Sequence, residues 1–418
     1  MQKSVANSTG TRDTAVALIA TLIAIYGVSQ FARNSIGVLA NDLARELDLS
    51  ATQIGLLSSV FFFSFAAAQI PVGIAIDRYG PKLTMLVSVT ICVLGTVLFA
   101  FAPSATILIM ARMMIGLGCS TFLMAPLAIY ARRFPPTQFA MLASLQMGLA
   151  NIGTLLATAP LAASAAAIGW RYSFLVFAGV TAIIGLLVLK VIPRDRTGEA
   201  ARESWIDTFR GIGMAVRTRS FWPVFLAHLT GYSSFAAVVG LWAGPWLSDV
   251  YGADLALRGR LLLIGAGAQI AGLLLWGASD RYWRSYRRPV LVGIVISAGL
   301  LLYAAMVPMS LVGATIWLGL FGLMIAYTPI VTAHGKALFP PMLTGRGITL
   351  MNIGSMGGAF IAQSLTGALV DWVGRVGEGY PPSAYRLVFA SLAVGLLITS
   401  VVYARAGDPH PSAGSATE

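Results

Sequence analysis

The sequence predicts an all-α membrane protein whose twelve transmembrane helices form two six-helix bundles in parallel pseudo-repeat. Three observations support this fold class. The 418 residues are 57% hydrophobic and 11% charged, whereas soluble proteins carry about 25% charged residues. Twelve apolar stretches approach or exceed the roughly 20 residues that a helix needs to cross a bilayer. The sequence of the first half is also weakly repeated in the second half.

The twelve stretches define the elements in chain order, and they break at prolines, glycines or charged residues. Strand-like alternation of apolar and polar residues is absent, which argues against a transmembrane barrel. The first stretch contains Arg33 and lacks a small-residue cleavage site, so we expect a helix rather than a signal peptide. The predicted helices cover residues 14–40, 51–76, 83–102, 105–131, 138–166, 171–192, 220–246, 258–279, 288–307, 311–336, 345–370 and 384–404.

Three short sequence matches define the internal repeat, and all three lie about 204 residues apart. Their shared register makes chance agreement a poor explanation. A membrane chain built twice in parallel is typical of transporters, because two similar bundles can rock about a site between them. The matches are Asp77-Arg78-Tyr79 with Asp280-Arg281-Tyr282, Phe134-Pro135-Pro136 with Phe339-Pro340-Pro341, and Ser29 and Phe31 with Ser233 and Phe235.

The repeat divides the chain into four parts. We expect an N-terminal bundle over 14–192, a cytoplasmic linker over 193–219, a C-terminal bundle over 220–404 and a disordered tail over 405–418. The linker mixes charges of both signs with Trp205, Ile206 and Phe209, which favours an amphipathic surface helix. The tail is rich in Pro, Ser, Ala and Gly, a composition that does not build a packed core.

The formal net charge of +12 is explained by membrane topology rather than by nucleic-acid binding. With both termini in the cytoplasm, most of the 28 lysines and arginines fall in inside segments, as the positive-inside bias requires. We therefore expect a monomeric, integral protein of a bacterial inner membrane with no nucleic-acid partner. Cys92 and Cys119 both fall inside helices and give no disulfide framework.

The segment from Gly73 to Lys82, Gly-Ile-Ala-Ile-Asp-Arg-Tyr-Gly-Pro-Lys, resembles the loop 2–3 signature of the major facilitator superfamily. Pro81 stands where the family usually has Arg. The resemblance implies a charged latch, in which Asp77 meets a helix N-terminus or an Arg of the opposing bundle. The alternative is that any loop here must be charged. We assign conformational gating to Gly73, Asp77, Arg78, Gly80 and Lys82, and to Asp280 and Arg281 in the second copy.

Other motifs extend the resemblance along the chain. The segment 112–118 is similar to the superfamily's helix 4 motif, R-x3-G-x-G, and Gly169-Trp170-Arg171 with Phe174 is similar to the start of helix 6. The run from 33 to 73 looks like the organic-anion branch, the anion:cation symporters, which implies an organic anion as substrate. In that branch an Asp precedes the helix 1 Arg and a Glu follows the helix 4 Arg by seven residues. This chain has Ala32 and Cys119 at those positions.

Two arginines lie inside predicted helices with no acid at the same depth. All 16 acidic residues map to loops, tails or helix ends, whereas Arg33 and Arg112 lie roughly 9 Å from the membrane midplane. A central arginine costs about 2.5–3.5 kcal/mol to insert, so a mobile carboxylate is a natural partner. Two alternatives stay open: Arg33 could snorkel to the outer interface, and backbone carbonyls could satisfy Arg112.

Polar and aromatic side chains at helical spacing complete the predicted site. The resemblance turns one face of helix 1 and a helix 7 stripe toward the transport path; the stripe runs through His228, Tyr232, Phe235, Val239, Trp242 and Trp246. Interhelical hydrogen bonding is the competing interpretation for each polar residue, and a lipid or interface belt is the alternative for the stripe. The predicted substrate-binding set is Arg33, Tyr26, Gln30, Arg112, Tyr232, His228, Tyr327, Asn151, Asn352 and Gln363.

The sequence therefore predicts a secondary active or facilitative transporter that moves a small organic anion, a monocarboxylate, by alternating access. Multidrug efflux is an alternative, because aromatic residues and Met suit lipophilic cations. Copper import through Met and Cys ligands and a sensor without transport are minor alternatives. The sequence has no H-E-x-x-H and no nucleotide loop, so we expect no enzymatic activity, cofactor or metal.

The mode of coupling is a separate expectation. Because no acid lies at mid-membrane depth, we expect anion exchange or facilitated uptake rather than obligate proton symport. An anion carrying its own proton is one alternative. A second is that His228 titrates near neutral pH and carries the proton, although it could equally be a hydrogen-bonded core histidine.

Overall fold

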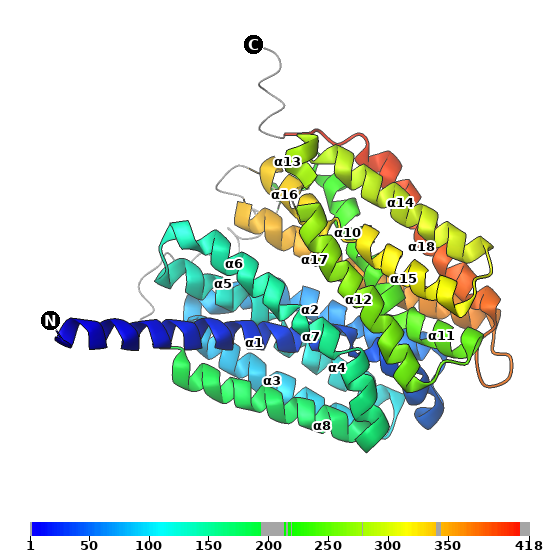
Figure 1. Ribbon diagram of the computed structural model, residues 1–418, viewed down its shortest axis with the longest axis horizontal. Coiled ribbons are helices and arrows are strands. Elements are labelled where there is room, and N and C mark those ends of the chain that lie inside the picture. The colour runs from blue at the N-terminus through cyan, green and yellow to red at the C-terminus, as the bar shows by residue number, and fades with distance from the viewer. Residues whose placement is uncertain are drawn as a thin grey trace, which may run out of the picture.

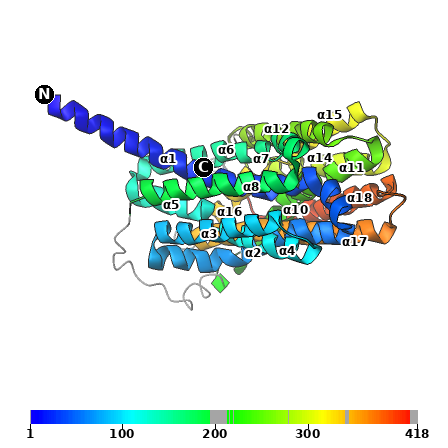
Figure 2. The same ribbon diagram turned by 90° about the horizontal axis from the view of Figure 1, so that it is seen from below.

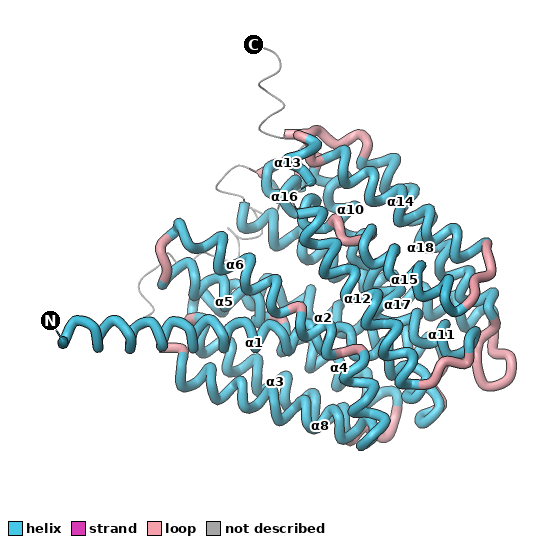
Figure 3. Tube along the Cα trace, viewed as in Figure 1, coloured by secondary structure: helices cyan, strands magenta, loops and turns pink. Residues whose placement is uncertain are grey.

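The computed structural model describes residues 2–193, 213–214, 216–218, 220–277, 279–339 and 344–409. These residues are almost entirely helical (Figure 3). The helices form two groups, one from each half of the chain (Figures 1 and 2); within each group they run roughly parallel, and the two groups are inclined to each other in Figure 1. The linker helix predicted around Trp205, Ile206 and Phe209 lies outside the described residues.

The first half contains α1 to α8 in chain order. A serine caps α2: the Ser50 hydroxyl accepts from Gln53 N, and the Gln53 side chain accepts from Ser50 N, a reciprocal arrangement that satisfies two otherwise unpaired donors. Gly80, with φ of +81°, makes the turn into α3. The bounds are α1 Gln2–Leu47, α2 Ala51–Tyr79, α3 Pro81–Ala100, α4 Ala105–Cys119, α5 Thr121–Arg133, α6 Pro136–Ala150, α7 Ile152–Leu156 and α8 Ala159–Val191.

The second half contains α10 to α18. Its first crossing is interrupted by a π-helical turn, η1, and the crossing over α15 and α16 is broken just before Pro329, which cannot donate a backbone hydrogen bond. The bounds are α10 Phe221–Ala237, η1 Val238–Trp242, α11 Ala243–Tyr251, α12 Leu255–Gly277, α13 Ser279–Trp283, α14 Arg287–Met306, α15 Leu311–Met324, α16 Thr328–Leu338, α17 Thr344–Val373 and α18 Pro382–Tyr403.

The described residues include 11 segments that are long and apolar enough to cross a membrane. One of them, Thr137–Val191, has 55 residues, far more than the roughly 20 that a single crossing needs. Its backbone breaks at Gly169, which has φ of +79°, so this segment holds two crossings. The chain is therefore an integral membrane protein, and the predicted all-α, twelve-helix fold is confirmed.

The two halves approach most closely where glycines remove side chains from facing helices. A Cβ atom built on Gly244 of α11 would lie 1.9 Å from the carbonyl oxygen of Gly37 on α1. A Cβ on Gly55 of α2 would lie 2.6 Å from the carbonyl oxygen of Gln363 on α17 and 3.0 Å from the Cα of Gly367. Small residues allow such close backbone packing within membranes, and here they join the halves toward one end of the molecule.

The last described residues pack against the second half. Asp408 accepts hydrogen bonds from the hydroxyl of Ser285 and, at 3.0 Å, from the backbone N–H of Tyr286, so its carboxylate lies at the start of α14. Residues 405–409 thus have defined contacts within the segment that composition assigned to a disordered tail, and 410–418 lie outside the described residues.

Candidate functional site

Arg33 of α1 lies at the centre of a cluster of aromatic side chains between the two halves, and it is 6% exposed. Its guanidinium carbon lies 4.6 Å from the ring centroid of Phe65 on α2. Tyr26 and Tyr232 are electrostatic neighbours of the guanidinium. The rings of Phe62 and Tyr232 lie 6.2 Å apart, which joins α2 to α10. We call these five residues the guanidinium cluster.

The Arg33 charge is buried without an acidic partner. Within the described part of the chain, the ion pairs involve Arg132, Arg171, Arg258 and Arg375, and the Nε atom of Arg33 has no hydrogen-bond partner. Burial of a charge is costly unless it is paired. A planar guanidinium with free donors can bind a carboxylate through two parallel hydrogen bonds, so the cluster has the chemistry of an anion site.

Arg112, the second intramembrane arginine, is held by the protein backbone. Its NH1 group donates to the Ala32 carbonyl at 2.8 Å and its Nε to the Leu57 carbonyl at 3.4 Å. The guanidinium carbon lies 5.0 Å from the Phe61 ring centroid, and the residue is 0% exposed. Its NH2 group has no hydrogen-bond partner among the described residues. Arg112 therefore ties α4 to α1 and α2, and its burial keeps it out of reach of a substrate in this conformation.

The polar residues predicted on α1 and at the end of α6 pair with each other. Gln30 Nε2 donates to Asn151 Oδ1 at 2.9 Å, and Asn151 Nδ2 donates to the Met147 carbonyl at 2.7 Å. One turn further along α1, Asn34 Nδ2 lies 3.3 Å from the Thr154 hydroxyl. These bonds position α1 against α6 and α7, next to the guanidinium cluster.

Gln363 lies at the closed end of the site, where the halves meet. Its Nε2 donates to the Ala236 carbonyl at 2.9 Å, while its Oε1 is buried without a partner among the described residues. A Cβ built on Gly240 would lie 3.6 Å from Asn34 Oδ1 and 3.9 Å from Gln363 Nε2. The amides of Asn34 and Gln363, from different halves, thus converge on the π-helical turn, one helical turn beyond Arg33.

The other predicted residues of the second half lie apart from the cluster or face into their own half. His228 Nδ1 lies 3.0 Å from the Ser355 hydroxyl and Nε2 3.5 Å from Thr332 Oγ1, so hydroxyls flank both ring nitrogens. Tyr327 is fully buried, and its hydroxyl has no partner in the described part of the chain. Asn352 is half-buried on α17, one turn before Ser355.

A polar network that the sequence did not predict ties the halves together at one end, which we call the sealed end. Asn41 Nδ2 donates to Asp249 Oδ1 at 3.0 Å, and Arg258 forms an ion pair of 2.9 Å with Asp42. Arg375 lies 3.3 Å from Asp48 Oδ1. The acids of this network could be seen in the sequence just after the predicted helices 14–40, 220–246 and 345–370. Their partners could not be predicted, because they belong to the opposite half.

Asp371 of α17 completes the sealed end by capping α2. Its two carboxylate oxygens accept from the backbone N–H groups of Ala51 at 2.9 Å and Thr52 at 2.8 Å, where the helix dipole favours negative charge. The Tyr380 hydroxyl donates to the same carboxylate at 2.7 Å. Burial raises the pKa of the Tyr380 hydroxyl, so it remains a donor at neutral pH.

The predicted latch residues lie at the opposite end, which we call the latch end. Asp77 lies 3.6 Å from Arg132 NH2 of α5, the Arg78 guanidinium lies 5.5 Å from the Tyr79 ring centroid, and Lys82 Nζ donates to the Leu189 carbonyl at 2.7 Å. Gly73 faces open space on α2. Asp280 and Arg281 lie on α13, directly after α12.

Two helical halves meet at the sealed end, and between them lies a buried guanidinium without an acidic partner among the described residues; this is the architecture of a membrane transporter. The sequence matches the family model described as Major Facilitator Superfamily over residues 22–338. The chain therefore belongs to the major facilitator superfamily, as its motifs predicted.

Several relatives of this chain are named as transporters of organic anions. The hexuronate transporter of Bacillus subtilis is 26% identical over 90% of this chain and 92% of its own. The gentisate transporter of Corynebacterium glutamicum is 26% identical over 87% of this chain and 83% of its own. The probable L-galactonate transporter of Escherichia coli is 26% identical over 81% and 79%. The predicted resemblance to the organic-anion branch is confirmed.

Solved structures support the fold alone. A bacterial homologue of the human lysosomal transporter Spinster, in an inward-facing and unoccupied conformation, has a TM-score of 0.77 and 19% identity over 93% of this chain and 96% of that chain. A D-xylose-proton symporter has a TM-score of 0.69 at 14% identity, over 91% of this chain and 96% of that chain.

Proposed function

We propose that the protein is a secondary transporter that moves a small monocarboxylate across a bacterial inner membrane by alternating access. The observation that carries this proposal is the buried Arg33 guanidinium, which lies between the halves and has no acidic partner among the described residues. The organic anions named for the relatives support the substrate class.

One guanidinium suits one carboxylate. The second intramembrane arginine, Arg112, donates to backbone carbonyls, so a dicarboxylate would leave one charge without a partner in the cluster. The rings of Phe62, Phe65 and Tyr232 present aromatic faces, which gain apolar contact with a planar or aliphatic ligand body. A thermal-shift screen tests this preference by comparing aliphatic and aromatic monocarboxylates with dicarboxylates, sugar acids and lipophilic cations. Stabilisation by the cations alone would favour efflux instead.

The glycine contacts and the polar network close the sealed end, so we propose that the described conformation opens at the latch end. The basic residues of the latch end include Arg78, Lys82, Arg132 and Arg133, and the positive-inside bias places such residues in the cytoplasm. The conformation is then inward-facing, with both termini cytoplasmic.

We expect Asp77→Asn to leave substrate affinity nearly unchanged and to slow turnover several-fold. The carboxylate lies at the latch end, on the same helix as Phe65 but 12 residues away, so about 18 Å of helix separates it from the cluster. It can therefore act only on the balance between access states. Equilibrium binding and proteoliposome exchange, measured on the same preparation, check this. Equal losses of affinity and rate would contradict a latch role.

We also propose anion exchange or facilitated uptake rather than obligate proton symport. His228, the alternative proton carrier, is flanked by two hydroxyls, as expected of a hydrogen-bonded core residue. We expect His228→Gln to keep counterflow and to leave uptake as insensitive to an imposed proton gradient as in the wild type. If a proton gradient concentrates substrate in wild-type vesicles and His228→Gln abolishes only that effect, His228 is the carrier.

A further inference from the structure

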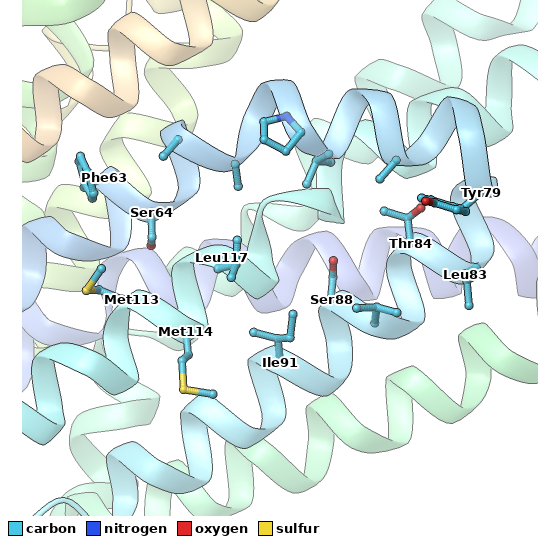
Figure 4. A pocket seen from close by; sticks show the side chains of 16 residues that line it. Phe63, Ser64, Tyr79, Leu83, Thr84, Ser88, Ile91, Met113, Met114 and Leu117 are labelled. Carbon is cyan, nitrogen blue, oxygen red and sulfur yellow. The ribbon is translucent and has the colours of Figure 1, made fainter. Parts of the chain in front are cut away.

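A deep groove runs along the outer surface of the first half, between α2, α3 and α4, and encloses about 790 Å³. It extends from Phe63 and Met113 at one end to Tyr79 and Leu83 at the other (Figure 4). It is separate from the guanidinium cluster, which lies between the halves.

The lining of the groove is apolar. Most of the lining side chains are aliphatic, aromatic or thioether groups, three are the hydroxyl residues Ser64, Thr84 and Ser88, and none is charged. Two of these hydroxyls bond to their own helices: Ser64 donates to the Phe61 carbonyl at 3.1 Å and Thr84 to the Gly80 carbonyl at 2.8 Å. Only an apolar occupant can exploit such a surface.

The groove opens where the surrounding medium is lipid. Its rim includes Phe63, Leu83, Val87 and Leu117, which are between 42% and 53% exposed and belong to membrane-spanning segments. Its floor includes Ala68, which is 4% exposed. The recess is therefore deeper than an ordinary lipid-facing surface, and small residues of α2 create it.

The groove is long enough to hold one lipid chain. From Phe63 to Tyr79, α2 advances about 24 Å, about four-fifths of a hydrocarbon core about 30 Å thick and more than one leaflet of it. The groove thus runs from the membrane interior to the latch-end interface, where Tyr residues commonly lie. The Arg78 guanidinium beside Tyr79 is exposed there, which suits the phosphate of a headgroup.

We propose that this groove binds one acyl chain of a membrane phospholipid, with its phosphate at the Tyr79 end. The chain packs between α2 and the pair α3 and α4. Its inner end reaches Phe63, whose ring lies 5.2 Å from that of Phe360 on α17. A bound lipid therefore adjoins the contact between the halves on this side of the molecule.

The test uses the full-length protein in nanodiscs containing a phosphatidylglycerol that bears a photoreactive diazirine in one chain. Mass spectrometry maps the labelled residues. We expect labelling of Val87, Ile91 and Leu117 to exceed that of the lipid-facing residue Val180 on α8. Ala67→Phe, which fills the groove from its wall, should lower groove labelling about tenfold.

Val180→Phe is the matched control, since it adds the same ring on a lipid-facing helix outside the groove, and it should leave groove labelling unchanged. Ala75→Leu fills the groove nearer its interfacial end and replaces Ala67→Phe if that variant fails to fold. Equal labelling of the groove and of α8, or groove labelling that both filling variants leave unchanged, would overturn the proposal. So would crosslinking of the groove to a second copy of the chain in place of lipid.

Discussion

Replacement of Arg33 by Ala is expected to weaken substrate binding about 30-fold or more, since truncation of one partner in a buried charged pair costs about 2–5 kcal/mol. Arg33→Lys keeps the charge but loses the planar pair of donors, so we expect an intermediate loss of about tenfold. Binding isotherms of the purified variants with the best monocarboxylate from the thermal-shift screen measure both effects.

Arg33→Ala should leave the ligand-free protein as stable as the wild type or make it more stable. Arg33 has no acidic partner within the described residues, so its removal relieves an uncompensated burial cost. Arg112→Ala is the matched control, because it leaves the Ala32 and Leu57 carbonyls without their donor and should lower the melting temperature. Wild-type transport by an Arg33→Ala protein would exclude Arg33 as the anion site.

Gly244→Ala is expected to open the sealed end. The added methyl group would lie 1.9 Å from the Gly37 carbonyl oxygen, so α1 and α11 must separate, and overpacking of this kind costs about 1–3 kcal/mol. Two access states commonly differ by only a few kcal/mol. The sealed state should therefore become a minor species, and exchange should slow about tenfold.

Distance measurements between spin labels at positions 45 and 378 report this change, with Cys92 and Cys119 replaced by Ala. Both sites are exposed and line the same cavity of about 480 Å³ at the sealed end, from opposite halves. Gly267→Ala on α12 is the control, because its methyl group meets no atom within 4 Å. An unchanged distance distribution in Gly244→Ala would mean that the glycine contact does not determine the access state.

The sequence was sufficient to predict the architecture, because length, apolar content and charge asymmetry are local properties of each helix. It also singled out Arg33, since a charge inside an apolar stretch is visible without a structure. The role of Arg112 was left open because its partners are backbone carbonyls of α1 and α2. Carbonyls are present in every residue and leave no mark in a sequence.

The stripe predicted from His228 to Trp246 shows why helical spacing alone could not predict the whole site. The π-helical turn over Val238–Trp242 changes the face that later residues present. Trp242 Nε1 donates to Thr366 at 2.8 Å, and Trp246 packs against Trp317 and Phe389, within its own half. Only the part of the stripe before the turn, at Tyr232, joins the guanidinium cluster. The sealed-end network was missed for a related reason, since each ion pair joins residues about 200 or more positions apart.

The central claim is that Arg33 recognises the charge of a carboxylate, and paired ligands test it most directly. Each monocarboxylate that stabilises the protein is compared with its primary amide, which has nearly the same shape but no charge. Our account predicts that the wild type binds the acid at least about 30-fold more tightly than the amide, and that Arg33→Ala binds both equally weakly. Equal affinity of the wild type for acid and amide, or a preference for the acid that survives in Arg33→Ala, would contradict it.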